Sequence, residues 1–373
     1  MLQLDDPRRP MPRALLDAPG GFAWWYLEML DAQQNGLVLI WAFGLPFIPG
    51  YTSDARKGTP QRPIDRPCLV LSLYEKGRPS FYTFHEFAPE EASWDGANRW
   101  TFGDTVIERQ DVGDQRIVTA HLNCPVVSCQ APIQGTIQVS GVIPVPPKRA
   151  EAEPPEHIWT PLAYPARGHA VLQLEDQPPW VMEGPAYHDR NGSHKGLHAL
   201  GIQTWLWGHA SLDDQERVVY LLWPEGSRTP QVLGFEIDLQ GQLTERHDLT
   251  AWLSPQRRTS FGMPTWDRLE VRDGYGTWLA MRMDQTLDHG PFYLRYTTTV
   301  ENGHDLPGTA EIIVPERIDL MRHRFMVKMR VAQPDHNSFW LPLFQGPRRG
   351  RVQRLVRQLW QPLFENPRSR SIA

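Results

Sequence analysis

Short runs of alternating or β-branched residues, separated by turn signals, fill almost the whole chain and are what most constrains its fold. The segment 135–139 (GTIQV), for example, has the polar–apolar period of two that marks a strand with one buried face. Turn pairs such as Asn35-Gly36 and Lys76-Gly77 end the runs. We interpret the following runs as strands: residues 22–31, 36–43, 67–74, 79–87, 98–109, 115–122, 133–145, 168–175, 179–188, 199–210, 216–223, 231–243, 268–273, 276–287, 291–301, 308–314 and 324–332.

This strand pattern predicts an all-β protein built from closed antiparallel barrels. Many strands in up-and-down order favour closure, because closure removes exposed sheet edges. At 373 residues the chain is too long for one small core, so we expect two domains. Two segments fit a boundary: residues 144–156 (PVPPKRAEAEPPE) by their linker-like composition, and residues 190–198 (RNGSHKGLH) by their polar, glycine-bearing character.

Charge, cysteine usage and hydropathy narrow the class of protein. The net charge of −5 gives no global field for binding nucleic acid. Three cysteines are an odd count that suits a reducing compartment. Neither a secretory signal nor an apolar run of the roughly 18–20 residues that span a bilayer is visible, so we expect a soluble, cytoplasmic protein. The 15 tryptophans indicate either a broad apolar cavity or a well-filled core.

The C-terminal stretch 346–364 breaks the β pattern. Its apolar residues recur on one face of a helix, which Pro362 should end early. From residue 346 onward there are seven arginines and one glutamate, a net charge of +6. Such a basic amphipathic stretch suits a membrane surface, and a helix docked on a barrel with solvated arginines is the alternative. The helical face comprises Val352, Leu355, Val356, Leu359, Trp360 and Leu363.

Familiar catalytic and metal-binding signatures are absent. The sequence contains no GxSxG, HExxH, Walker loop or GxGxxG after a strand. Cys124 and Cys129 lack the further ligands of a structural zinc site. His194 and His198 stand four apart, but no third ligand accompanies them. We therefore predict no metal site.

The most informative region combines His157, Trp159, Tyr187 and Asp189 beside two predicted strands. In an extended strand Tyr187 and Asp189 point to the same face, and His188 points away. If that face is apolar, desolvation raises the pKa of the aspartate and makes it a general acid. The alternative is a strand-ending turn, because the tetrapeptide Asp-Arg-Asn-Gly at 189–192 has good turn chemistry.

Two motifs in this region resemble those of the carotenoid 1,2-hydratase (hydroxyneurosporene synthase) family. They are His-x-Trp-x-Pro-x-Ala-x-Pro-x-Arg at 157–167 and Gly-x-x-Tyr-x-Asp-x-Asn at 184–191. Residues 24–26 (WWY) and 287–293 (LDHGPFY) resemble an early and a late family segment, so the likeness runs from about residue 22 to residue 330. One departure is Arg190, where the family pattern leads us to expect a small residue or histidine.

The resemblance implies two consecutive lipocalin-like barrels, a fold shared with tocopherol cyclases, and no metal or organic cofactor. It favours the second boundary, so we place the N-terminal barrel at 1–195, the C-terminal barrel at 196–345 and the basic tail at 346–373. The implied reaction adds water across the terminal C1=C2 double bond of an acyclic carotenoid or related terpenoid.

Each site residue takes an implied role from the same resemblance. Asp189 would donate the proton, Tyr187 would orient it, and His157 would hold or deprotonate the attacking water. Trp159 would face the cation. The remaining candidates would line or support the substrate site: Trp205, Trp207, Asn191 and Arg167.

Two other functions remain open from the sequence. One is a different terpenoid enzyme on the same scaffold, a cyclase or an isomerase. The other is a carrier that binds an apolar ligand without chemistry. The expected partners are a hydrophobic carotenoid or terpenoid and, through residues 347–364, the inner face of a membrane, but not nucleic acid.

Overall fold

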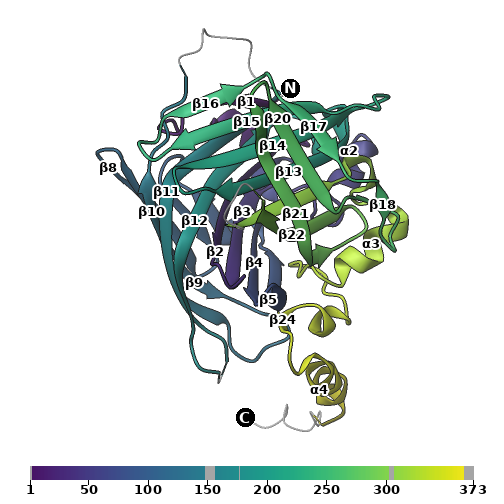
Figure 1. Ribbon diagram of the computed structural model, residues 1–373. Helices are drawn as coiled ribbons and strands as arrows, with labels where there is room; N and C mark the ends of the chain where they lie inside the picture. The colour runs from purple at the N-terminus through teal and green to yellow at the C-terminus, as the bar shows by residue number, and fades with distance from the viewer. Residues whose placement is uncertain (1, 148–155, 176, 302–305, 365–373) are drawn as a thin grey trace.

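The structure is a computed structural model that describes residues 2–147, 156–175, 177–301 and 306–364. Two large sheets, of thirteen and nine strands, dominate this described part and curl toward one another (Figure 1). Every pairing in them is antiparallel except that of β1 with β11. The predicted all-β architecture of two lipocalin-like antiparallel barrels is therefore confirmed, with each barrel formed as a curled half-barrel sheet.

The first sheet follows the order β24-β5-β4-β3-β2-β12-β11-β10-β9-β8-β7-β6, with β1 paired to β11. Two up-and-down runs of strands thus meet where β2 pairs with β12. The strands are β1 (Leu2–Leu4), β2 (Phe22–Leu30), β3 (Gly36–Phe43), β4 (Pro67–Glu75), β5 (Arg78–Glu86), β6 (Ala92–Trp94), β7 (Arg99–Phe102), β8 (Thr105–Val112), β9 (Gln115–Cys124), β10 (Ile133–Val142), β11 (His157–Gln173), β12 (Trp180–Ser193) and β24 (Gly346–Pro347).

The second sheet follows the order β16-β15-β14-β13-β23-β22-β21-β20-β17, and β18 pairs with β19 in a small separate sheet. Its strands are β13 (Ile202–Ser211), β14 (Gln215–Pro224), β15 (Gln231–Asp238), β16 (Leu243–Arg246), β17 (Thr250–Leu253), β20 (Arg268–Asp273), β21 (Gly276–His289), β22 (Tyr293–Val300) and β23 (Leu306–Ile313), and the small sheet consists of β18 (Arg257–Arg258) and β19 (Pro264–Thr265).

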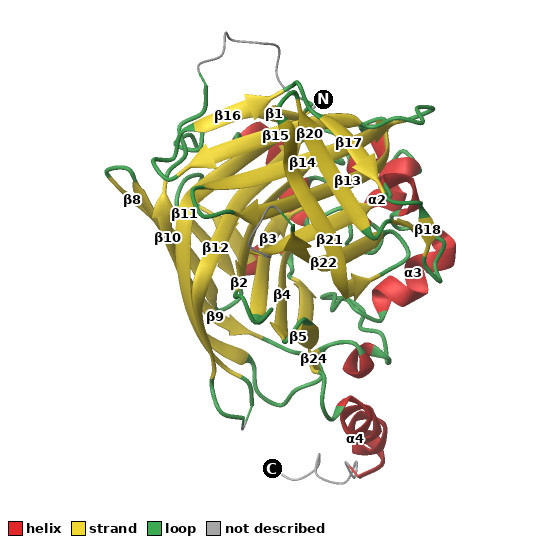
Figure 2. Ribbon diagram, viewed as in Figure 1, coloured by secondary structure: helices red, strands yellow, loops and turns green. Residues whose placement is uncertain are grey.

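Four α-helices accompany the sheets in the described residues, and α3 and α4 lie outside both sheets (Figure 2). They are α1 (Arg13–Asp17), α2 (Tyr51–Arg56), α3 (Met321–Lys328) and α4 (Arg351–Phe364). The predicted strand at 324–332 is wrong, because α3 occupies most of it and buries His323 and Val327, four residues apart on one helical face. Within the described residues, no helix combines the length and apolar character that crossing a membrane requires.

The chain passes from the first sheet to the second between β12 and β13, at residues 194–201. Strands β10 and β11, which flank residues 144–156, pair with each other in the first sheet. The chain returns to the first sheet after β23, where β24 pairs with β5. The first two residues of the predicted tail at 346–373 thus belong to the first sheet.

Tryptophans fill the core of the first barrel. Trp25 stacks on Trp41 with ring centroids 6.2 Å apart, and it lies 5.7 Å from Trp94 and 5.1 Å from Trp100. Each of these four rings is buried. For these residues the well-filled core, one of the two explanations of the tryptophan content, is the correct one.

A further buried cluster lies between the two sheets, and we call it the seam. It contains Tyr26, Trp159 and Tyr187 from the first sheet, and Trp207 and Tyr220 from the second. The first sheet's residues come from three neighbouring strands: Tyr26 from β2, Trp159 from β11 and Tyr187 from β12.

Arg190, the residue that departs from the family pattern, anchors the N-terminal segment. Its side chain, 1% exposed, ion-pairs with Asp5 at 2.8 Å. The guanidinium also donates to the carbonyl oxygens of Arg9 at 2.6 Å and Asp6 at 3.0 Å. A cation buried to this degree needs such partners, so Arg190 and residues 5–9 depend on one another.

Replacing Arg190 with Met should lower the free energy of unfolding by about 3–5 kcal/mol, because breaking a buried pair leaves polar groups without partners. Urea denaturation measures the loss. The control is Arg62→Met, which removes an exposed pair with Asp65 and should cost less than about 1 kcal/mol. Equal losses in the two variants would contradict the anchoring role.

Candidate active site

Strand β12 places three polar side chains in or beside the seam. Tyr187, Asp189 and Asn191 are two residues apart and share one face of the strand. His188 points the other way and stacks on a core tryptophan, with ring centroids 5.5 Å apart. Strand β11 lies alongside, and Trp159 is opposite Asn191 in the register. Two neighbouring strands thus bring the predicted residues together.

The carboxyl group of Asp189 is the centre of this arrangement. Its Oδ2 accepts hydrogen bonds from the Trp159 indole N–H at 2.7 Å and from the Tyr187 hydroxyl at 2.8 Å. The residue is 2% exposed. Burial raises the pKa of Asp189 to about 7, although the two hydrogen bonds lower it. A large fraction of the carboxyl group is therefore protonated at neutral pH, as a general acid requires.

The side chain of Asn191 lies between His157 and Asp189 and contacts both. Its Nε2 lies 3.2 Å from Asn191 Oδ1, while Asn191 Nδ2 lies 3.5 Å from Asp189 Oδ1. Because the amide oxygen can only accept, Nε2 carries the imidazole proton and Nδ1 keeps its lone pair. Burial lowers the pKa of His157 to about 3, so the ring is neutral, and Nδ1 has no hydrogen-bond partner among the described residues.

Aromatic rings from the second sheet cover these groups. Trp159 packs on Tyr220 and Phe235, with ring centroids 5.5 and 4.6 Å away. Trp205 lies 5.0 Å from His157, and Trp207 lies 5.6 Å from the Tyr187 ring. Both predicted substrate-lining tryptophans therefore reach the seam, and the site draws on both sheets.

Two other sequence interpretations do not fit this arrangement. Residues 189–192 are not a turn, because β12 runs on to Ser193 and residues 189–192 pair with both β11 and β2. Arg167 does not join the site, since it is an exposed residue that lies 3.8 Å from exposed Glu183. A strand rises about 3.3 Å per residue, which places Arg167 roughly 25 Å along β11 from Trp159.

A set of buried charged residues near the seam, one of which packs on Tyr187, was not predicted from the sequence. His209 lies between the carboxylates of Glu28 and Glu216, and Arg295 pairs with Glu311 at 2.6 Å. The sequence places two of these residues on the seam-facing side of their strands. His209 continues the alternation of Trp205 and Trp207, and Glu28 follows Tyr26 at the same spacing of two. Which charges would meet could not be read from that alternation.

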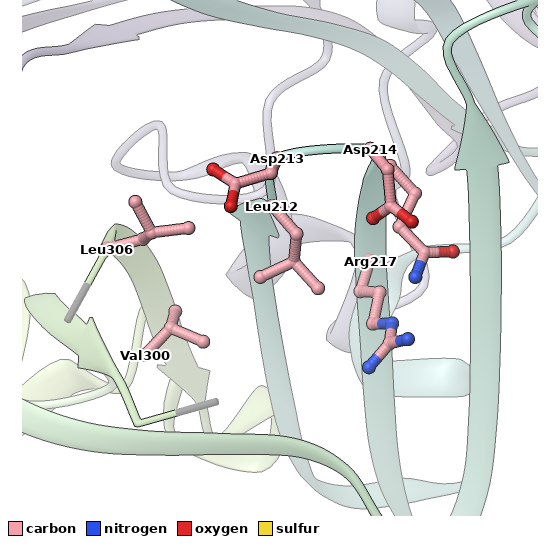
Figure 3. A pocket seen from close by; sticks show the side chains of 7 residues that line it. Leu212, Asp213, Asp214, Arg217, Val300 and Leu306 are labelled. Carbon is pink, nitrogen blue, oxygen red and sulfur yellow. The ribbon is translucent and has the colours of Figure 1, made fainter. Parts of the chain in front are cut away.

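A pocket of about 330 Å³ lies away from the predicted residues, between the β13–β14 turn and the ends of β22 and β23 (Figure 3). Its lining residues are Leu212, Asp213, Asp214, Gln215, Arg217, Val300 and Leu306. None of the predicted site residues lines it. In the described part of the chain, no three His, Cys, Asp or Glu side chains gather as a metal site would require.

The raised pKa of Asp189 should make folding depend on pH. The carboxyl titrates near 3.8 when unperturbed and near 7 in the folded protein. Between these values the folded state binds more protons than the unfolded state, so the free energy of unfolding falls as pH rises. Asp189→Asn removes this penalty, and should gain roughly 4 kcal/mol relative to the unchanged protein between about pH 4 and about pH 7.

Urea denaturation at a series of pH values measures this difference. Glu183→Gln, an exposed carboxyl on the same strand, is the matched control and should show no such trend. A stability difference for Asp189→Asn that stays constant with pH would contradict the raised pKa.

Two known proteins are similar to this chain in sequence. The chain is 23% identical over 358 residues to a hydroxyneurosporene dehydrogenase of Chlorobaculum tepidum, which covers 88% of this chain and 92% of that protein. It is 29% identical over 231 residues to an acyclic carotenoid 1,2-hydratase of Thiocapsa roseopersicina, covering 58% of this chain and about half (51%) of that relative.

Solved structures share the fold. A candidate AttH of Nitrosomonas europaea matches with a TM-score of 0.54 and 14% identity over 79% of this chain and 92% of that one. CghA with bound Sch210972 matches with a TM-score of 0.50 and 11% identity over 83% of this chain and 95% of that one.

Residues 41–338 match the family described as carotenoid hydratase CrtC. Since that match spans most of the chain, the protein belongs to the carotenoid hydratase family and is an enzyme of the hydratase class.

Proposed function

We propose that this enzyme adds water across the terminal C1=C2 double bond of an acyclic carotenoid. The family match supports a carotenoid hydratase, and one relative is named as an acyclic carotenoid 1,2-hydratase. The observation that carries the proposal is the buried carboxyl group of Asp189, with its pKa of about 7, among aromatic rings. A carrier of an apolar polyene would gain nothing from burying a carboxyl group there.

Proton transfer from Asp189 begins the reaction. Trp159 and Tyr187 both donate to Oδ2, so the acidic proton resides on Oδ1. It passes to C2, the π electrons form the new C–H bond, and C1 becomes a tertiary cation. Asp189 is left as a carboxylate, which the two donors stabilise through charge-assisted hydrogen bonds.

The aromatic wall around Trp159 stabilises the cation at C1. An aromatic face attracts a cation by about 0.5–2 kcal/mol, with the larger values where water is excluded. Trp159 is fully buried against Tyr220 and Phe235.

Capture of water completes the addition through His157. Its Nδ1 carries a lone pair and has no hydrogen-bond partner in the part of the chain that the structure describes. As the water oxygen bonds to C1 it becomes a strong acid, so even an imidazole with a pKa of about 3 accepts its proton. That proton then returns to Asp189. One hydrogen has been added at C2 and one hydroxyl group at C1, the elements of water.

Replacing Asp189 with Asn should abolish hydration while folding and polyene binding persist. Asn matches the shape of Asp but cannot deliver a proton, and general-acid help is worth about 10²–10⁴-fold. Tyr187→Phe should lose less, because it removes a hydrogen bond and not the proton. The measurement is incubation with lycopene or neurosporene, with the products weighed for added water.

Glu183→Gln on the exposed part of β12 is the control and should keep full activity. For the unchanged enzyme, the rate should fall as pH rises through about 7, because the acid must be protonated. Hydration by Asp189→Asn at the unchanged rate would refute Asp189 as the acid. Products of altered skeleton and unchanged mass would identify a cyclase or an isomerase, and binding without any product a carrier.

We also propose that helix α4 contacts the membrane from which a carotenoid is drawn. Val352, Val356 and Leu359 are exposed at spacings of four and three, hence on one face of the helix. Arginines gather at its start, and the sequence from residue 346 carries a net charge of +6. Exposed Phe339 and Trp340 stand just before the short helix at 341–343, which packs on α4. Basic and aromatic groups together suit an anionic lipid surface.

Deleting residues 347–373 should weaken sedimentation with vesicles that contain anionic lipid, while hydration of detergent-dispersed substrate continues. Neutral vesicles are the control, since they lack the charge that attracts arginine. If the truncated protein binds anionic vesicles as well as the full chain, or unfolds, α4 is a docked structural helix instead.

A further inference from the structure

His209 on β13 is held between two carboxylates from two other strands. Its Nδ1 lies 2.6 Å from Glu216 Oε1 on β14, and its Nε2 lies 3.5 Å from Glu28 Oε1 on β2. The three residues are buried. Nδ1 is hydrogen-bonded to Glu216, while Nε2 is within ion-pair distance of Glu28. A protonated imidazole has a proton on both ring nitrogens, so two flanking carboxylates favour a cationic ring.

Hydroxyl groups fix the two carboxylates in turn. Ser211 donates to Glu216 Oε2 at 2.6 Å, and the hydroxyls of Tyr26 and Thr309 both donate to the Glu28 carboxylate. These partners come from strands of both sheets, so the plane of the His209 ring is set from several sides.

The fixed ring lies flat against Tyr187. The two ring centroids are 4.1 Å apart with an interplanar angle of 24°. The Tyr187 hydroxyl donates to Asp189 Oδ2 at 2.8 Å. His209 therefore contacts the ring of the residue that hydrogen-bonds the acid, without itself bonding to the acid.

We propose that His209 is a positioning residue that acts on Asp189 through Tyr187. It holds the phenol ring so that the hydroxyl points at Oδ2, and its positive charge draws electron density from the phenol, which makes the hydroxyl a stronger donor. This role rests on the proposed hydration. Glu28 and Glu216 have a supporting role, because they keep the ring charged and in place.

The electrostatics of His209 agree with that geometry. Burial by itself lowers the pKa of His209, but the carboxylates of Glu216 and Glu28 outweigh it and raise the pKa to about 10. The ring therefore stays cationic over the pH range in which Asp189 titrates.

A double-mutant cycle tests the route through Tyr187. His209→Gln should lower kcat for lycopene hydration about tenfold with KM changed less than about twofold, because the substrate site remains and only the acid is affected. In the Tyr187→Phe background the same change should cost less than about twofold, since no hydroxyl is left to position. Equal losses in both backgrounds, or none, would overturn the proposal.

The matched control is His85→Gln. His85 packs against Phe87 with ring centroids 4.5 Å apart, and Phe87 belongs to the core cluster of the first barrel, so kcat should not change. If His209→Gln does not fold, Glu216→Gln takes its place in the cycle. It keeps an acceptor for Nδ1 but removes the charge that holds the ring protonated.

Infrared spectroscopy gives a readout that needs no turnover. The band of the protonated Asp189 carboxyl, assigned by its loss in Asp189→Asn, reports the hydrogen bonds that the group receives. His209→Gln should shift this band in the direction in which Tyr187→Phe shifts it, with no further shift in the double variant. If no carotenoid is hydrated, the proposed function fails, while an unshifted band separately refutes the role of His209.

Discussion

The positions of the seam side chains depend on the pairing of β12 with β11 on one side and with β2 on the other. Asp189 lies opposite Pro161 of β11 and opposite Tyr26 of β2. Because side chains alternate along a strand, a slip of one residue would exchange the faces and place His188 and Arg190 in the seam. Pairing on both edges makes such a slip costly, since it would break two rows of hydrogen bonds at once.

The seam holds ionised and neutral acids side by side, and their partners explain the difference. Glu28 and Glu216 face the imidazolium of His209, and Glu311 faces the guanidinium of Arg295. Asp189 receives its hydrogen bonds from the neutral donors Trp159 and Tyr187. A buried carboxyl without an adjacent cation lowers its free energy by keeping its proton. The same low-polarity surroundings thus yield a structural ion pair in one place and an acid in another.

The alternation of residues along the chain predicts the placement of Tyr187 and Asp189 better than it predicts which residues surround them. Alternation alone puts Tyr187 and Asp189 on one face, and the structure agrees. The positions of His157 and Trp159 depend on the pairing of β11 with β12, which periodicity does not predict; the family resemblance singled out these residues by motif alone.

Residues that meet only through the packing of the two sheets could not be predicted. Glu28 and Thr309, which are hydrogen-bonded, stand 281 positions apart in the chain. Arg167 shows the opposite error, because closeness in sequence to the motif is not closeness in space along an extended strand. Arg190 looked like an exception to a pattern, and it proved to be the buried partner of residues 5–9.

The strand that closes one side of the first sheet comes from the far end of the chain. Gly346 and Pro347 pair with β5, and Gln345 donates to the carbonyl oxygen of Phe84, 261 positions earlier. A ribosome therefore releases β2 to β5 long before their edge can be covered, and the whole second sheet is synthesised in the interval. Throughout that time the backbone of β5 is open to pairing with other chains. The late synthesis of residues 345–347 therefore leaves the order of translation, and not only the stability of the finished fold, to affect how this sheet is completed.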